Sequence, residues 1–114
     1  MTELSKNMRA RIMEAISLIA SEEAQRKYQS AVPQVDVPAE LFNQWEDCFF
    51  PDDRAFQEGF GAVEREALER FNDVLNQVCE ETPQQLPNLD EFVTTASWRK
   101  LSEAARAALS VLAP

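Results

Sequence analysis

The stretch FQEGFGAVEREALERFNDVLNQV, residues 56–78, carries an apolar repeat that spans roughly six helical turns. Its apolar residues recur every three or four positions, the spacing that places them on one face of an α-helix. Glycine disfavours a helix interior, so we expect a kink or break at Gly59–Gly61. The pattern predicts a long helix whose inward face comprises Phe56, Phe60, Val63, Ala67, Phe71, Val74, Leu75 and Val78.

Two further helical patterns precede this stretch. Residues 4–24 show the same spacing of apolar positions, and Ser21 offers a second N-cap if that helix breaks. Pro33 and Pro38 are incompatible with a continuous helix interior, so the first helical region ends there. Asp36 can then cap a second helix that has Pro38 in its first turn. The apolar stripe of that helix is predicted to be Leu41, Trp45, and Cys48 or Phe49.

The C-terminal part also has helical signals. Residues 80–87 read as a connector, and Asn88 followed by Glu91 resembles a capping box that opens a short helical turn. Thr95 or Ser97 can cap a last helix, whose apolar face is Trp98, Leu101, Ala105, Ala108, Leu109 and Leu112. No stretch of the sequence predicts a convincing strand. We therefore predict an all-α fold: a compact bundle of four to five helices in one domain, residues 1–114.

The charge of the chain is unevenly distributed. Residues 36–91 hold fifteen of the twenty carboxylates and three bases, a net −12, whereas the whole chain carries −9. Such asymmetry builds a negative field that steers a partner of opposite sign. It also repels nucleic-acid phosphates and anionic membrane surfaces. The composition predicts a basic protein partner, with neither nucleic acid nor a membrane as a partner.

Several catalytic chemistries lack their residues in this chain. Histidine is absent, which removes the Ser-His-Asp and Cys-His pairs and the usual zinc sites. The two glycines, Gly59 and Gly61, are too few for a phosphate-cradling or dinucleotide-binding loop. We expect no catalytic residue, no enzymatic activity and no cofactor.

The two cysteines and the N-terminal sequence bear on the compartment. Cys48 and Cys79 match no metal or redox spacing, and we expect both to be buried thiols of the core. The first thirty residues contain no signal-peptide core, and no apolar run reaches transmembrane length. The expected location is the reducing cytoplasm.

The segment from Trp45 to Glu58 is the predicted site. Aspartates at 52 and 53 have a structural use, because they can cap the next helix. Glu46 and Asp47 have none, because negative charge is unfavourable in the last turn of a helix. Such a feature favours a functional role. The predicted partner-binding residues are Phe42, Glu46, Asp47, Phe50, Asp52, Asp53 and Glu58.

The aromatic residues in this region exceed what one small core can absorb. Helical spacing assigns Trp45 and Phe56 to the core. Phe42 or Phe50 is then expected to be at least half exposed, and an exposed aromatic among acids resembles a protein-binding hot spot.

Three alternatives stay open. Residues 52–54 lack the alternation and the glycine of a calcium loop, whereas a magnesium site and a carboxylate-based metal-dependent enzyme remain conceivable. The acids from Glu64 to Asp73 form a second acidic face, which includes the i,i+4 pair Glu66–Arg70.

The alanines of residues 104–108 are expected to pack on the first helix. A homodimer seam or a structural subunit of a larger assembly is the alternative, and a monomer is favoured.

The sequence also resembles small acidic immunity proteins of bacterial toxin systems. The resemblance lies in LFNQWED (residues 41–47) with FPDD (residues 50–53), the helix over residues 56–78, the Leu86-Pro87 connector and the final WRKL helix (residues 98–101). It implies a tight protein inhibitor that blocks the basic surface or active site of a toxin domain.

Overall fold

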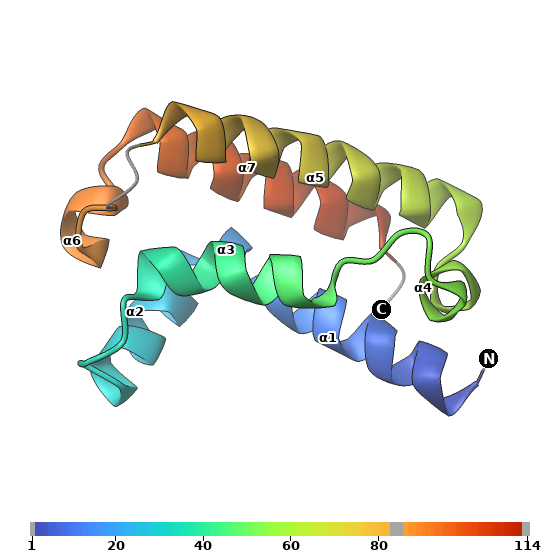
Figure 1. Ribbon diagram of the computed structural model, residues 1–114. Helices are drawn as coiled ribbons and strands as arrows, with labels where there is room; N and C mark the ends of the chain where they lie inside the picture. Colours follow the sequence, from blue (N-terminus) through green and yellow to red (C-terminus); the bar gives the residue numbers. More distant parts are fainter. Residues whose placement is uncertain (1, 83–85, 113–114) are drawn as a thin grey trace.

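The computed structural model describes residues 2–82 and 86–112, and in these residues it contains helices and no strand (Figure 1). The all-α prediction is confirmed. The predicted number of helices is wrong. The chain breaks at both Ser21 and Gly59–Gly61, and the short turn after Asn88 counts as a helix of its own. The seven helices are α1 (Glu3–Ala20), α2 (Glu22–Ala31), α3 (Val37–Cys48), α4 (Arg54–Gly59), α5 (Ala62–Glu81), α6 (Leu89–Phe92) and α7 (Ala96–Val111).

Local capping chemistry sets most of the helix boundaries. Ser21 ends α1 and starts α2, and its hydroxyl accepts a hydrogen bond from the Ala24 N–H at 3.0 Å. Asp36 caps α3 through the Ala39 N–H, Asn88 caps α6 and Thr95 caps α7, all as predicted. Helix α5 extends to Glu81, so the predicted connector begins later than expected. Its residues 83–85 lie outside the described part of the chain.

The break at Gly59–Gly61 lets α4 lie directly on α1. A Cβ atom at Gly59 would lie 2.9 Å from the carbonyl oxygen of Ser5, so only glycine permits this approach. The Arg9 guanidinium of α1 donates to the Gly59 carbonyl at 2.9 Å and to both carboxylate oxygens of Glu64 at 3.0 Å. It also lies 4.8 Å from the centre of the Phe60 ring. Arg9 therefore joins α1 to the end of α4 and the start of α5.

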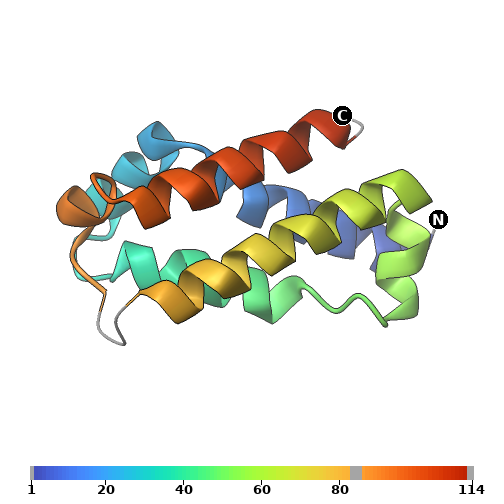
Figure 2. The ribbon, with the colours of Figure 1, turned by 90° about the horizontal axis from the view of Figure 1, so that it is seen from above.

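The four long helices α1, α3, α5 and α7 form two layers, with α5 and α7 above α1 and α3 (Figures 1 and 2). Helix α7 packs on both α5 and α1, and α1 packs on α3 and α4. Alanines permit these close contacts, and Ala105 and Ala108 of α7 are buried as predicted.

Aromatic side chains fill the wider space between α3 and α5. Trp45 is fully buried, its ring centroid lies 4.7 Å from that of Phe71, and its indole N–H donates to Asn72 at 3.0 Å. Phe49 stacks on Trp45 at 4.8 Å, and its ring meets that of Phe56 edge to face at 5.4 Å. The core roles predicted for Trp45 and Phe56 are confirmed.

Three predicted core residues are exposed. Val63 is 69% exposed because the break at Gly61 restarts the helix, and the inward face of α5 begins only at Ala67. Leu4, the first apolar position of the repeat predicted over residues 4–24, is 73% exposed in the first turn of α1, where Ser5 is the residue turned inward. Cys48 is buried as expected, whereas Cys79 is exposed, and both are free thiols.

Candidate interaction surface

Glu46 and Asp47 occupy the last turn of α3, as predicted. The helix ends where the Phe49 N–H donates to the Trp45 carbonyl at 2.9 Å. Both carboxylates are exposed, and this turn contains no basic residue. Negative charge is unfavourable at this end of the helix dipole, and the cation beside it, Arg11, comes from α1 and contacts the Asp47 backbone oxygen.

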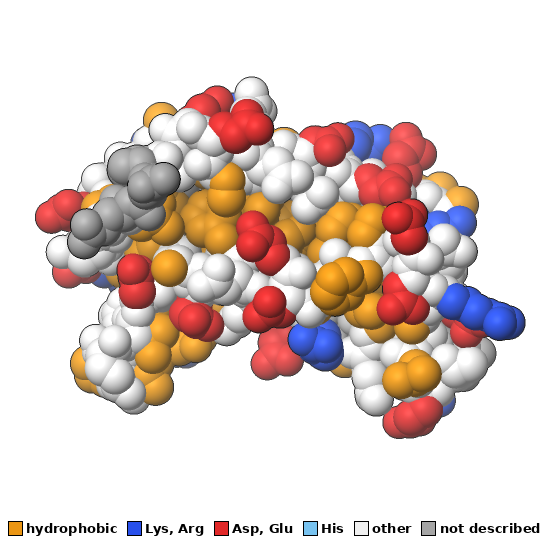
Figure 3. Space-filling view, viewed as in Figure 1, with side chains coloured by type: hydrophobic (Ala, Val, Ile, Leu, Met, Phe, Trp, Pro, Cys, Tyr) orange, Lys and Arg blue, Asp and Glu red, His pale blue; other side chains and the backbone are white. Residues whose placement is uncertain are grey.

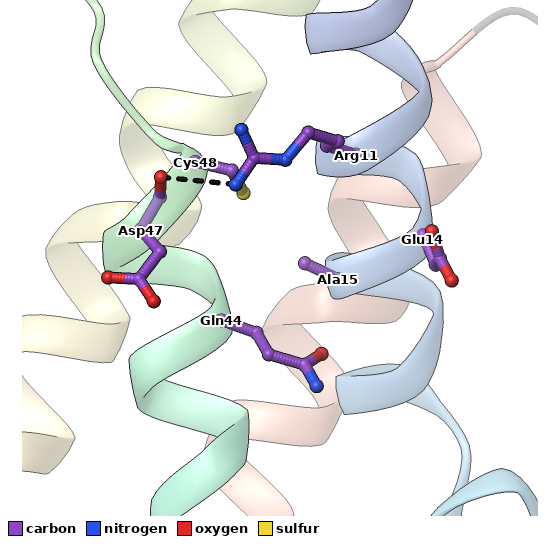
Figure 4. A pocket seen from close by; sticks show the side chains of 6 residues that line it. All are labelled: Arg11, Glu14, Ala15, Gln44, Asp47 and Cys48. Carbon is purple, nitrogen blue, oxygen red and sulfur yellow. Dashed lines mark hydrogen bonds between the residues drawn. The ribbon is translucent and has the colours of Figure 1, made fainter.

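The two adjacent acids face different neighbours, because successive helical residues point about 100° apart. Glu46 faces α5, where it lines a shallow pocket of about 270 Å³ with Phe42, Asn43 and Cys79 among others. Asp47 lines a second pocket, between α3 and α1, together with Arg11 and Gln44, and its carboxylate is turned away from α1 (Figure 4). Figure 4 shows Arg11 reaching from α1 to the Asp47 backbone oxygen, at 3.4 Å, with Glu14 turned away.

Phe50 is the exposed aromatic of the site. It is 50% exposed in the loop between α3 and α4, whereas Phe42 is only 6% exposed. Phe42 fills the space between α3 and α6, and its ring centroid lies 6.4 Å from that of Phe92. The expectation that Phe42 or Phe50 is half exposed is met by Phe50 and not by Phe42, so the role of apolar anchor falls to Phe50.

The remaining predicted acids have different local roles. Asp53 caps α4, because its carboxylate accepts from the Ala55 N–H at 3.0 Å. Glu58 pairs with Arg54 at 2.8 Å in an i,i+4 geometry. Asp52 is exposed, and its side chain has no hydrogen-bond or ion-pair partner in the described part of the chain. Asp52 is thus the acid of this loop that has no structural use.

Acids of α5 extend the site across the space between the two helices. Asn72 and Cys79 both face α3, and Glu69, Asp73 and Glu80 occupy the adjoining exposed ridge of α5. Figure 3 shows a band of apolar side chains between α3 and α5 with acidic side chains on either side. The loop from α3 to α4 runs along this side of the molecule (Figures 1 and 2). We call the surface made by Glu46, Phe50, Glu69, Asp73 and Glu80 the α3–α5 face.

Sequence reasoning treated the α5 acids as a separate surface and missed that they join Glu46. The signal in the sequence was the spacing of Asn72 and Cys79: residues seven apart lie on the same helix face, here the one directed at α3. Glu64 had been grouped with these acids, but its side chain is only 15% exposed because Arg9 binds it. The i,i+4 pair Glu66–Arg70 is confirmed at 2.9 Å.

The α3–α5 face holds concentrated negative charge. Burial raises the pKa of the Cys79 thiol, and the carboxylates of Glu46 and Glu80 raise it further. Over residues 2–82 and 86–112, none of Glu46, Glu69, Asp73 and Glu80 forms an ion pair. Carboxylates without an ion-pair partner suit contact with lysine or arginine side chains.

Other chemistry has less support in the described residues. Within them, no three cysteine, aspartate or glutamate side chains converge as a group able to hold a metal ion. None of the helices seen there combines the length and the apolar character needed to span a membrane. The chain matches no protein-family model, no curated protein and no solved structure, so function is inferred from its own residues.

Proposed function

We propose that this chain is a non-catalytic protein-binding domain that docks a positively charged protein through the α3–α5 face and the adjoining loop acid Asp52. The observation that carries the proposal is Phe50, which is half exposed in a loop whose sequence neighbours Asp47 and Asp52 are exposed and form no ion pair within the described residues. Half-exposed aromatics surrounded by polar groups are typical centres of protein interfaces.

Charge and apolar contact have separate roles in this proposal. The carboxylates raise the association rate of a basic partner, an effect that salt weakens. The Phe50 ring loses its exposed area on binding and thereby slows dissociation. Glu46 and Asp47 sit where they oppose the dipole of α3, which is the expected pattern when an acid is kept for binding.

In its most specific form, the proposal is that the chain is a bacterial immunity protein. Its partner is then a toxin domain whose basic surface or active site it covers. The support is the resemblance carried by residues 41–53 together with the unpaired acids and the exposed ring that this same segment contributes. A basic active site, such as that of a nuclease, is the complement that such a surface requires.

Site-specific photo-crosslinking tests the proposal. A photoreactive phenylalanine analogue replaces Phe50 in one variant and Leu4 in a matched control, because both side chains are large, apolar and exposed. In extracts of the native cells we expect the Phe50 variant to capture one basic protein and the Leu4 variant to capture none. Equal capture at both positions would contradict the proposal, as would an acidic partner.

A growth assay tests the immunity form. The captured protein is expressed in bacteria alone and together with this chain. We expect the partner alone to arrest growth and co-expression to restore it. A captured partner that binds at Phe50 but leaves growth unaffected would contradict the immunity form and leave the binding role standing.

A further inference from the structure

A second surface lies between α5 and α7, away from α3. It is a groove of about 270 Å³ lined by Ala67, Arg70, Phe71, Val74, Ala104, Ala107, Ala108 and Val111. Seven of these eight side chains are apolar, and Arg70 is the exception. Covering this groove with another apolar surface is therefore favourable in free energy.

Exposed valines extend the groove at one end. Four large hydrophobic residues are exposed in the described chain, and two of them, Val63 and Val111, belong to this region. Val111 lines the groove, and Val63 lies one helical turn before Ala67 on the same side of α5. The apolar area thus continues past the groove onto its rim.

The charges around this groove include both signs and are mostly paired. Arg70 binds Glu66 at 2.9 Å, and Lys100 of α7 binds Glu81 of α5 at 3.4 Å across the helix pair. Glu103 lies beside them, one turn before Ala107. The acidic residues of the α3–α5 face, by contrast, form no ion pair in the part of the chain that the structure describes.

We propose that the α5–α7 groove binds a second copy of this chain in a two-fold symmetric dimer. In a two-fold interface both copies present the same residues, so the patch must be self-complementary and carry both positive and negative charges. Two copies carrying −9 each repel one another at acidic surfaces, whereas the groove offers apolar area and both signs of charge. A two-fold axis can place Arg70 and Lys100 of each copy near acids of the other. The proposal departs from the monomer that the sequence favours.

This dimer leaves the α3–α5 face free, since the groove lies on the other flank of α5. The dimer would therefore carry two partner-binding faces. The interface is small, so we expect a reversible dimer with a dissociation constant on the order of micromolar or weaker. Because salt screens the repulsion between two acidic chains, dimerisation is expected to strengthen as ionic strength rises.

Analytical ultracentrifugation of the full chain tests the proposal from about 1 µM to about 500 µM, a range that brackets such a constant. Reducing agent is present because Cys79 is exposed and could form disulfides. We expect the mean mass to rise towards that of two chains. The variant Val63→Glu with Ala107→Glu should raise the dimer dissociation constant at least tenfold.

A control variant, Leu4→Glu with Ala10→Glu, adds the same charge at exposed positions of α1 and should leave the dimer unchanged. Circular dichroism confirms that each variant keeps its helices. A chain that stays monomeric throughout would overturn the proposal and leave the groove to a different protein. A dimer that the groove variant does not weaken would overturn it as well.

Discussion

Helix α5 has α7 on one flank and α3 on the other, and the two flanks are built differently. Towards α7, alanines allow close packing, and the charged residues near the surface form pairs such as Lys100–Glu81. Towards α3, aromatic rings span a wider gap, and carboxylates such as Glu46 form no ion pair within residues 2–82 and 86–112. We therefore propose different partners for the two flanks of this helix: a second copy of the chain on the α7 side and a basic protein on the α3 side.

Trp45→Ala should have the largest effect on this contrast. Trp45 is fully buried and joins α3 to α5 through Phe71 and Asn72, so we expect a loss of about 3–5 kcal/mol in the free energy of unfolding. Urea unfolding measures it. The control Phe50→Ala should change stability by less than about 0.5 kcal/mol, because Phe50 is half exposed. A similar loss from both variants would show that the rings do not hold this flank together.

Enlarging an alanine tests the closely packed flank. Ala105 is fully buried in α7, whereas Ala107 is exposed. We expect Ala105→Leu to lower the free energy of unfolding by about 1–3 kcal/mol through overpacking. Ala107→Leu should leave it within about 0.5 kcal/mol. The idea of tight packing fails if thermal or urea unfolding finds no difference between the two.

A third comparison distinguishes an aspartate that caps a helix from a neighbouring aspartate that makes no stabilising bond. Asp53 caps α4, so Asp53→Ala should lower the free energy of unfolding by about 1 kcal/mol. Asp52 makes no such bond in the described chain, and Asp52→Ala should change stability by less than about 0.5 kcal/mol. Equal losses in chemical denaturation would assign both aspartates to the fold and remove Asp52 from the proposed surface.

The smallest effect is expected at Cys79. Burial and the carboxylates of Glu46 and Glu80 raise the pKa of its thiol, so less thiolate is present at a given pH. Glu46→Gln removes one of these causes, lowers the pKa and should speed alkylation by iodoacetamide near pH 8. Glu103→Gln, on α7, serves as the control and should leave the rate unchanged. An unchanged rate in Glu46→Gln would mean that this carboxylate does not act at the α3–α5 face.

Much of the fold could be predicted because its signals are local. Ser21, Asp36 and Asn88 cap helices at the positions that their side chains indicate, and Gly59–Gly61 breaks the helix where glycine allows it. The exposure of Val63 was missed because the apolar repeat was followed across that break. A repeat loses its phase wherever the helix restarts.

The site was predicted only in part, because some of its features depend on local sequence and others on contacts between distant segments. A helix end places Glu46 and Asp47 in its last turn, but only tertiary packing decides that Glu46 lines a pocket with α5 and Asp47 one with α1. The number of aromatic residues around Trp45 exceeds what one small core can absorb, and this indicated that Phe42 or Phe50 is exposed. That Phe42 is covered and Phe50 is not depends on Phe92, fifty residues away. Glu64 caps α5 locally through the Gly61 N–H, but its ion pair with Arg9 joins distant segments and no local pattern reveals it.

Charge reversal on the α3–α5 face tests the account most directly. The variant Glu46→Lys with Asp52→Lys is compared with Glu23→Lys plus Glu103→Lys, which changes the net charge equally on α2 and α7. Binding to the protein captured through Phe50 is measured by surface plasmon resonance at low and high salt. We expect the first variant to lose at least ~2 kcal/mol of binding free energy, roughly thirtyfold in affinity, and most of its salt dependence. The second should bind like the wild type, whereas equal losses in both would reduce the effect to net charge and contradict the account.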